Sequence, residues 1–269
     1  MVALLMMSLA PAAPPGDGLK LKMAEMFFHQ GVEQAADSRQ ARPDFALAAQ
    51  VYEKFRQEGA DNPELFLNEG NAWFLAGDLP QSILAYRRGL RHAPHDLDLQ
   101  ANLAHARAQV NFPQAGAFAR PPIDHRPPWL PRWPSLLLLL AVVCYSLGWL
   151  ALARWYMVRR APWLKAGLML LAFTLLPAAG FAWEEWQLHQ DLARPLVVIA
   201  RDDTYLRRGN GAAYPPRYDT PLHQGTEARL LFDRRDGWLQ IELAGGEVGW
   251  VQRAACHVDE RHPPPVPGG

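Results

Sequence analysis

The sequence predicts a multidomain membrane protein with a helical block near the N-terminus, two membrane-spanning helices in the middle and a small β-rich block near the C-terminus. Three observations support this fold class. Two long uncharged apolar runs occupy the middle of the chain, apolar residues at helical spacing precede them, and short β-rich runs follow them. The length of 269 residues allows about one to three domains.

The charge of the chain falls into three blocks, although the whole chain is neutral with 27 basic and 27 acidic residues. Residues 1–124 carry a net charge of −3, residues 125–183 of +6 and residues 184–269 of −3. The middle block has no carboxylate at all, and most of the Trp lie in it or beside it. Because a water-exposed surface balances apolar area with charge, we expect this block in a lipid bilayer. The neutral total argues against nucleic-acid binding.

The two apolar runs predict transmembrane helices over residues 135–153 and 166–183. The first run is uncharged throughout and spans ~28 Å as a helix, against a hydrocarbon core of ~30 Å. The second run is uncharged and nearly as long, and its Pro177 and Gly180 are tolerated in a spanning helix. A buried helical hairpin of a globular protein is the alternative. Trp residues flank both runs, as in the aromatic belts of membrane proteins, and favour the bilayer.

Two features predict the orientation of these helices. Residues 154–165 contain four basic groups and no acid, so the positive-inside rule makes them a cytoplasmic loop. Residues 1–12 resemble a signal peptide that ends in Ala10-Pro11-Ala12, a small-x-small pattern suited to cleavage. This run is short and lacks a basic start, so a truncated start or no signal at all are alternatives. Both features place the N- and C-terminal domains on the periplasmic side of a bacterial inner membrane.

Residues 19–110 are predicted to be helical and to contain an internal repeat with a period of about 34 residues. Within residues 62–96, small, aromatic and turn residues stand at Gly70, Trp73, Gly77, Leu79, Ser82, Tyr86, Gly89 and Pro94. A shift by one period pairs Tyr52 with Tyr86, Ala48 with Ser82 and Phe45 with Leu79. The pattern resembles the tetratricopeptide repeat (TPR) and implies an α-helical TPR solenoid of two repeats, the first degenerate, with residues 97–110 as a cap. Such a short solenoid is expected to lean on a partner or on the membrane-proximal region.

The TPR resemblance also implies a concave peptide-binding groove. The residues that it places there are Leu67, Asn71, Phe74, Asn102 and His105. Asn side chains can hold a peptide backbone because they offer both a donor and an acceptor. The alternative is that these are ordinary solvent-facing residues. Leu67 stands where TPR domains that clamp a C-terminal carboxylate have Lys, which argues against that type of recognition.

Residues 111–134 are predicted to be a Pro-rich linker. The many prolines forbid a helix and favour an extended spacer of ~3.1 Å per residue, which would hold the repeats off the bilayer. A Pro-rich ligand for another domain is the alternative. Residues 260–269 form a second Pro/Gly-rich segment, a C-terminal tail.

Residues 194–259 are predicted to form a small all-β barrel. Short β-rich runs at 196–199, 228–232, 238–243 and 248–251 alternate with turn residues. Their motifs follow the order Leu206-Arg207-Arg208-Gly209, Tyr214, Asp236-Gly237-Trp238 and Gly249-Trp250-Val251. This order resembles the bacterial SH3 domain (SH3b) and implies an SH3-like barrel. Asn210 stands where that family usually has Pro, which implies a more flexible first loop.

Four aromatic residues of this block are candidate site residues. Trp238 and Trp250 are expected in the core of the SH3-like barrel, where a Trp closes the barrel edge. Tyr205 and Tyr214 lie in loops and are expected on an exposed contact surface. The resemblance to SH3b domains implies that this surface binds proteins or peptidoglycan, and the sequence leaves both open.

Catalytic patterns are absent from the sequence. It has no Gly-rich phosphate loop, nucleophile elbow or HExxH motif. His92 and His95 lack a third metal ligand nearby, and the two cysteines, Cys144 and Cys256, form no metal or disulfide framework. We therefore expect no enzyme activity, no cofactor and no metal.

The order of the modules is more specific than any single motif. Signal-like start, TPR repeats, Pro-rich spacer, two spans and SH3-like barrel together resemble the BatE-type proteins of bacterial aerotolerance (Bat) operons. This resemblance implies a non-enzymatic inner-membrane scaffold for oxidative or envelope stress, with membrane-anchored von Willebrand A-domain Bat proteins as partners. The alternative is a cell-wall sensor or anchor that binds peptidoglycan through the SH3-like domain.

Overall fold

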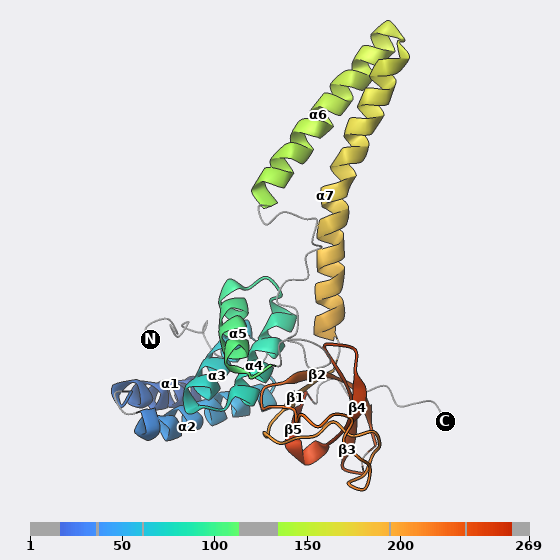
Figure 1. Ribbon diagram of the computed structural model, residues 1–269. Coiled ribbons are helices and arrows are strands. Elements are labelled where there is room, and N and C mark those ends of the chain that lie inside the picture. The colour runs from blue at the N-terminus through green and yellow to red at the C-terminus, as the bar shows by residue number, and fades with distance from the viewer. Residues whose placement is uncertain are drawn as a thin grey trace. The chain divides into compact units, whose positions relative to one another are not determined.

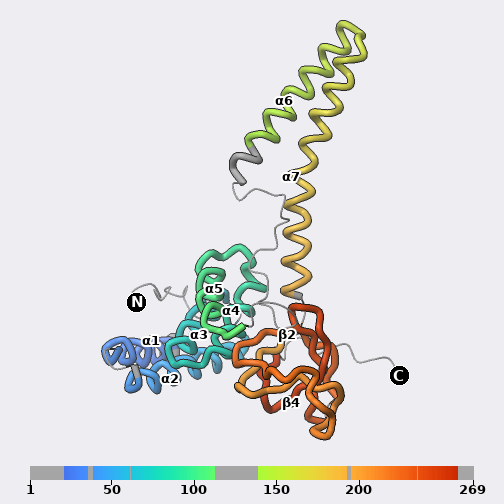
Figure 2. Tube along the Cα trace, in the orientation of Figure 1, coloured from blue at the N-terminus to red at the C-terminus, as the bar shows by residue number. Residues whose placement is uncertain are grey.

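The computed structural model describes residues 17–35, 38–60, 62–112, 134–193, 195–234 and 236–259. These residues form seven α-helices and one five-stranded antiparallel sheet (Figure 1 and Figure 2). The chain divides into two compact units: Met1–Pro122 together with Leu192–Gly269, here called the head, and Ile123–Asp191, here called the hairpin. The signal-like segment, most of the linker and the C-terminal tail lie outside the described residues.

The helical part of the head, here called the stack, has five helices, each of which packs against the next. They are α1 (Asp17–Glu33), α2 (Ser38–Gln57), α3 (Pro63–Ala76), α4 (Leu79–His92) and α5 (Leu97–Gln109). The last three begin at N-cap side chains, because Asn62, Asp78 and Asp96 each accept a backbone N–H of the first turn. Gly77, with φ of 88°, ends α3 in the left-handed conformation and allows the tight turn into α4.

The 34-residue period found in the sequence relates α2 to α4 but does not relate α1 to α3. Tyr52 and Tyr86, one period apart, are both buried in equivalent helices, α2 and α4. A shift of α3 back by one period would place a helix over 29–42, yet α1 ends at Glu33 and α2 already begins at Ser38. The residue that corresponds to the buried Trp73 is Arg39, which is exposed. This position belongs to the start of α2, so the first helices of the two pairs, α1 and α3, do not follow the 34-residue period.

The β part of the head, here called the sheet, has the strand order β4-β3-β2-β1-β5 with all neighbours antiparallel. Its strands are β1 (Leu196–Ile199), β2 (Glu227–Asp233), β3 (Trp238–Leu243), β4 (Val248–Gln252) and β5 (Cys256–Val258). A 3-10 turn, Arg253–Ala255, links β4 to β5. The four β-rich runs of the sequence are the first four strands. The fifth strand is too short to show a period of two.

The hairpin consists of α6 (Pro134–Val158) and α7 (Ala161–Ala193). The chain reverses at Arg159 and Arg160, so the loop predicted over 154–165 is mostly helical. Away from the turn the two helices spread apart (Figure 2). Nearer the turn their backbones approach closely, because a Cβ on Gly148 would lie 3.3 Å from the carbonyl oxygen of Gly167.

Both hairpin helices are long and apolar enough to cross a membrane. Only 11% of the apolar window in each is buried, and large side chains such as Leu150, Met169 and Leu175 are exposed. A helix that is apolar all round belongs either in a protein core or in a bilayer. Within the part of the chain that the structure describes, this hairpin is not the buried core of a globular domain.

Candidate interaction sites

The stack and the sheet pack together within the head, and the first of two ion-pair clusters at this junction centres on Glu227. Arg107 of α5 donates from Nε to Glu227 Oε1 at 2.5 Å and from Nη2 to Oε2 at 2.8 Å. Arg87 of α4 places its Nε 3.5 Å from the same carboxylate. All three residues are at most 7% exposed. This is a desolvated two-point guanidinium–carboxylate pair with a second cation beside it.

The second junction cluster centres on Asp259, which follows β5 and is fully buried. Arg88 of α4 donates from Nε to Asp259 Oδ1 at 3.3 Å, and Arg91 pairs with the same carboxylate. Arg88 also reaches back into the stack, where its Nη1 lies 4.0 Å from Glu69 Oε1. Burial raises the pKa of Glu69 above its usual value, against the opposing effect of Arg56 and Arg88. Arg88 thus contacts carboxylates of both parts of the head.

An apolar contact also joins the stack to the sheet. The loop before β2 carries Gly225, whose φ is 83°. A Cβ at this position would lie 2.7 Å from Val110 and 3.3 Å from both Ile83 and Leu79. Only glycine permits this backbone conformation and this close approach. Next to it, the side chains of Asn111 and His223 lie 3.5 Å apart.

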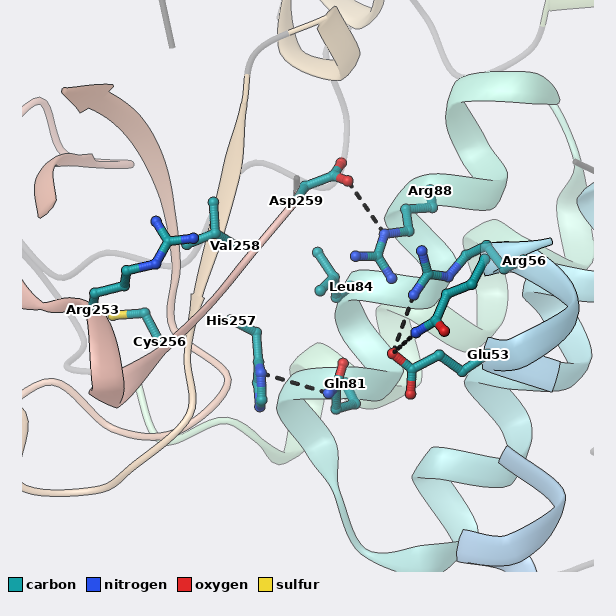
Figure 3. A pocket seen from close by; sticks show the side chains of 11 residues that line it. Glu53, Arg56, Gln81, Leu84, Arg88, Arg253, Cys256, His257, Val258 and Asp259 are labelled. Carbon is teal, nitrogen blue, oxygen red and sulfur yellow. Dashed lines mark hydrogen bonds and ion pairs between the residues drawn. The ribbon is translucent and has the colours of Figure 1, made fainter. Parts of the chain in front are cut away.

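A cavity of about 410 Å³ lies at the junction beside Asp259 (Figure 3). It is lined by Glu53, Arg56, Gln57, Gln81, Leu84 and Arg88 of the stack and by Arg253, Cys256, His257, Val258 and Asp259 of the sheet. Figure 3 shows His257 pointing toward Gln81, and their nitrogens Nδ1 and Nε2 lie 3.5 Å apart. Each arginine of the lining has a carboxylate: Arg56 pairs with Glu53, Arg88 with Asp259 and Arg253 with Asp233. The cavity therefore lies between the two parts of the head, and the arginines that line it are already paired with carboxylates.

Burial also sets the protonation of two lining residues of this cavity. It raises the pKa of the Cys256 thiol to about 12, so the thiol stays protonated near neutral pH. It lowers the pKa of His257. In the described part of the chain, no group of three or more His, Cys, Asp or Glu is placed to hold a metal ion.

A second, smaller cavity of about 230 Å³, here called the sheet groove, lies on the sheet alone. It is lined by Arg201, Asp202, Asp203, Thr204, Tyr205, Arg207, Trp238, Gln252 and Ala255. Tyr205 is 36% exposed and Trp238 is half-buried, so two aromatic faces border the groove. Asp203 has φ of 65°, which bends the loop beside Tyr205. Asp202 accepts the backbone N–H of Gln224 at 3.0 Å and fixes the other side of the loop.

The structure places neither Trp238 nor Trp250 in the buried core of the sheet. Side chains alternate along β3 and β4, and Leu239 and Val251 point inward while both Trp lie on the other face. Trp250 packs edge-on against Phe232, with ring centres 6.5 Å apart. The sequence motif correctly names the strands, but the buried positions are the residues next to the two Trp.

Tyr214 is exposed but does not line the sheet groove. It lies against Gly209, where an added Cβ would be 2.6 Å from its ring. Its carbonyl oxygen accepts Arg207 Nη1 at 2.7 Å. Of the two loop tyrosines, the structure thus brings only Tyr205 to the groove.

The five residues expected in a TPR groove are only partly open to solvent. Leu67 and Asn71 are buried at 5% and 1% exposure. Asn71 Oδ1 accepts the Tyr86 hydroxyl at 2.8 Å and Asn102 Nδ2 at 2.9 Å, so the two Asn bond to each other. Phe74 is half-buried, and its ring centre lies 5.2 Å from that of the exposed His105. The open part of this surface is the Phe74–His105 pair with Asn102 beside it.

Sequence patterns did not reveal the junction. Its partners are 120 residues apart for Arg107 and Glu227 and 171 apart for Arg88 and Asp259. No motif within one module contains both members of either pair.

Comparisons with known proteins leave the family of this chain open. No protein-family model, no curated protein and no solved structure matches it.

Proposed function

We propose that this protein is a non-enzymatic, two-pass membrane adaptor whose stack and sheet act as one interaction body outside the cytoplasm. The stack is proposed to be TPR-like and the sheet SH3-like. The proposed partners are membrane-anchored von Willebrand A-domain proteins of a Bat-type stress complex. The hairpin anchors this head to the bacterial inner membrane.

The contact between Arg107 and Glu227 carries the proposal. These residues precede and follow the hairpin in the sequence, yet they form a buried two-point ion pair. Two groups in direct contact must lie on the same side of a bilayer. The chain between them would therefore cross the bilayer an even number of times, which fits two spanning helices better than one.

The architecture of each module supports the names TPR-like and SH3-like. Consecutive helices pack in pairs in the stack, and α4 repeats the buried positions of α2 one period later. In the sheet, the order β4-β3-β2-β1-β5 and the 3-10 turn before β5 fit a small SH3-like barrel. The aromatic border of the sheet groove offers large contact area with little loss of side-chain freedom, as protein-binding sites do.

Cysteine accessibility tests the topology. In a chain with Cys144 and Cys256 replaced, single cysteines are placed at the exposed positions Ala101, Ala244 and Met157. A membrane-impermeant maleimide applied to intact spheroplasts should label A101C and A244C and leave M157C unlabelled until the membrane is opened.

Two outcomes of this labelling contradict the proposal. If A101C and A244C are labelled from opposite sides of the membrane, the stack and the sheet cannot form one head. Equal labelling of all three positions excludes a hairpin that crosses the membrane.

A photo-crosslinker at Tyr205 tests the partner. We expect adducts with a co-expressed von Willebrand A-domain membrane protein from position 205. Tyr214 is the matched control, because it is an exposed tyrosine of the same module that does not line the sheet groove. Co-sedimentation of the full chain with purified peptidoglycan, lost on Tyr205→Ala, would instead favour the cell-wall anchor.

A further inference from the structure

The turn of the hairpin carries an uncompensated positive charge. Arg154, Arg159, Arg160 and Lys165, here called the cationic turn, are all exposed. Residues 125–183 contain no Asp or Glu, so no carboxylate stands near them in sequence. Among the described residues, none of the four makes an ion pair, whereas the buried arginines of the head each face a carboxylate.

The geometry of the turn presents two of these cations together. Arg159 and Arg160 are the two residues between α6 and α7, and Arg159 takes a left-handed φ of 57°. Its backbone N–H still bonds to the carbonyl oxygen of Trp155 at 2.6 Å. The Arg159 guanidinium carbon lies 5.5 Å from the Trp155 ring centre and 5.1 Å from that of Tyr156. Stacking on these rings orders the guanidinium and leaves its in-plane N–H donors for a ligand.

Apolar and aromatic side chains surround the cationic turn. Tyr156 is 69% exposed, Met157 77% and Trp163 43%. The two apolar helices continue directly from this turn. A ligand that suits the whole surface must therefore offer both an anionic group and a hydrocarbon phase. A phospholipid offers both, whereas a nucleic acid or an acidic protein would leave the apolar side chains in water.

We propose that the cationic turn binds the phosphate-containing headgroups of anionic phospholipids and so selects the lipids around the hairpin. This inference rests on the proposed membrane anchoring of the chain. Each cation near an anionic lipid surface changes the affinity about fivefold. The four together set a preference for anionic over zwitterionic lipid.

Lipid retention by the full chain tests this inference. The chain is reconstituted in vesicles of phosphatidylcholine mixed with phosphatidylglycerol and extracted gently, and the lipids that remain bound are measured. Phosphatidylglycerol should be enriched over phosphatidylcholine. The variant R159Q/R160Q should lose about fivefold of this enrichment for each cation removed, and R159K/R160K should keep most of it because the charge remains.

The matched control is K22Q/R208Q, which removes the same charge from exposed positions of the head. We expect its lipid enrichment to equal that of the unsubstituted chain. Equal enrichment in R159Q/R160Q and the unsubstituted chain would overturn the inference. Failure of the chain to resist alkaline extraction from either vesicle would instead overturn the proposed anchoring, so the two failures are distinguishable.

Discussion

Glu227 is the first residue of β2, and its carboxylate also pairs with the buried Arg107 near the end of α5. Its carboxylate faces Arg107 and Arg87, and all three residues are buried. Removing one member of such a pair leaves a buried charge without compensation, which costs more than the pair itself contributes. Single substitutions at the junction are therefore expected to act strongly.

Glu227→Gln should lower the free energy of unfolding of the head by about 3 to 5 kcal/mol, because it removes the negative charge that faces the buried guanidinium groups of Arg107 and Arg87. Urea titration of the full chain in detergent, followed by circular dichroism, measures it. Glu242→Gln is the control: Arg229 donates to Glu242 at 2.8 Å, but both side chains are about one-third exposed. A change below about 1 kcal/mol is expected there. Equal effects of the two substitutions would show that burial does not set the energy.

His257 should make the head less stable in acid. Burial lowers its pKa, helped by Arg88 and opposed by Asp78 and Glu53. The unfolded chain therefore takes up a proton at a higher pH than the folded one, near about 6.5. The contribution of neutral His257 is complete above about pH 6.5 and is lost as the pH falls toward its folded pKa. In urea titrations from about pH 7 downward, the unsubstituted chain should lose stability relative to His257→Gln, and parallel curves would contradict this.

At the scale of elements, the sequence predicts what local periodicity encodes. The helices of the stack, the four longer strands and both apolar helices follow from apolar spacing and turn residues. The sequence does not predict on which face of the sheet Trp238 and Trp250 lie, because a motif identifies a strand without saying which of its two alternating faces meets the core. The boundary between α1 and α2 does not follow either, because the residue one period before the buried Trp73 is the exposed Arg39, which lies in the first turn of α2.

The contact between α3 and α4 depends on the absence of a side chain at Gly70. A Cβ at this position would lie 2.3 Å from the Tyr86 ring. Gly70→Ala should therefore cost about 1 to 3 kcal/mol of unfolding free energy, although alanine is the better helix former. Thermal or urea unfolding measures the loss. In a Tyr86→Leu background the same substitution should cost clearly less, and an unchanged cost would place the strain elsewhere.

At the scale of the whole molecule, the sequence predicts the modules but not their union. From the sequence, the short stack is expected to lean on a partner or on the membrane-proximal region, whereas in the structure it packs on the sheet. The net charges of the two terminal blocks, −3 each, give no sign that the blocks form ion pairs with each other. Arginines of the first block are neutralised by carboxylates of the last, and a sum over sequence blocks cannot show which charges meet.

Asp259→Asn and Glu227→Gln should be less than additive, since both clusters hold one interface between the stack and the sheet. Once one substitution has released the interface, the second has little left to break. The free energies of unfolding of the two single variants, the double variant and the unsubstituted chain measure the coupling. Strict additivity would mean that the two clusters stabilise the head independently of each other.

The order of synthesis gives the junction a further consequence. Arg87, Arg88, Arg91 and Arg107 emerge from the ribosome before the hairpin, and their partners Glu227 and Asp259 emerge after it. The head therefore cannot close until both hairpin helices and nearly the whole chain have been made. If one helix failed to insert, Glu227 and Asp259 would lie on the other side of the bilayer from these arginines, and the stack and the sheet could not pack together.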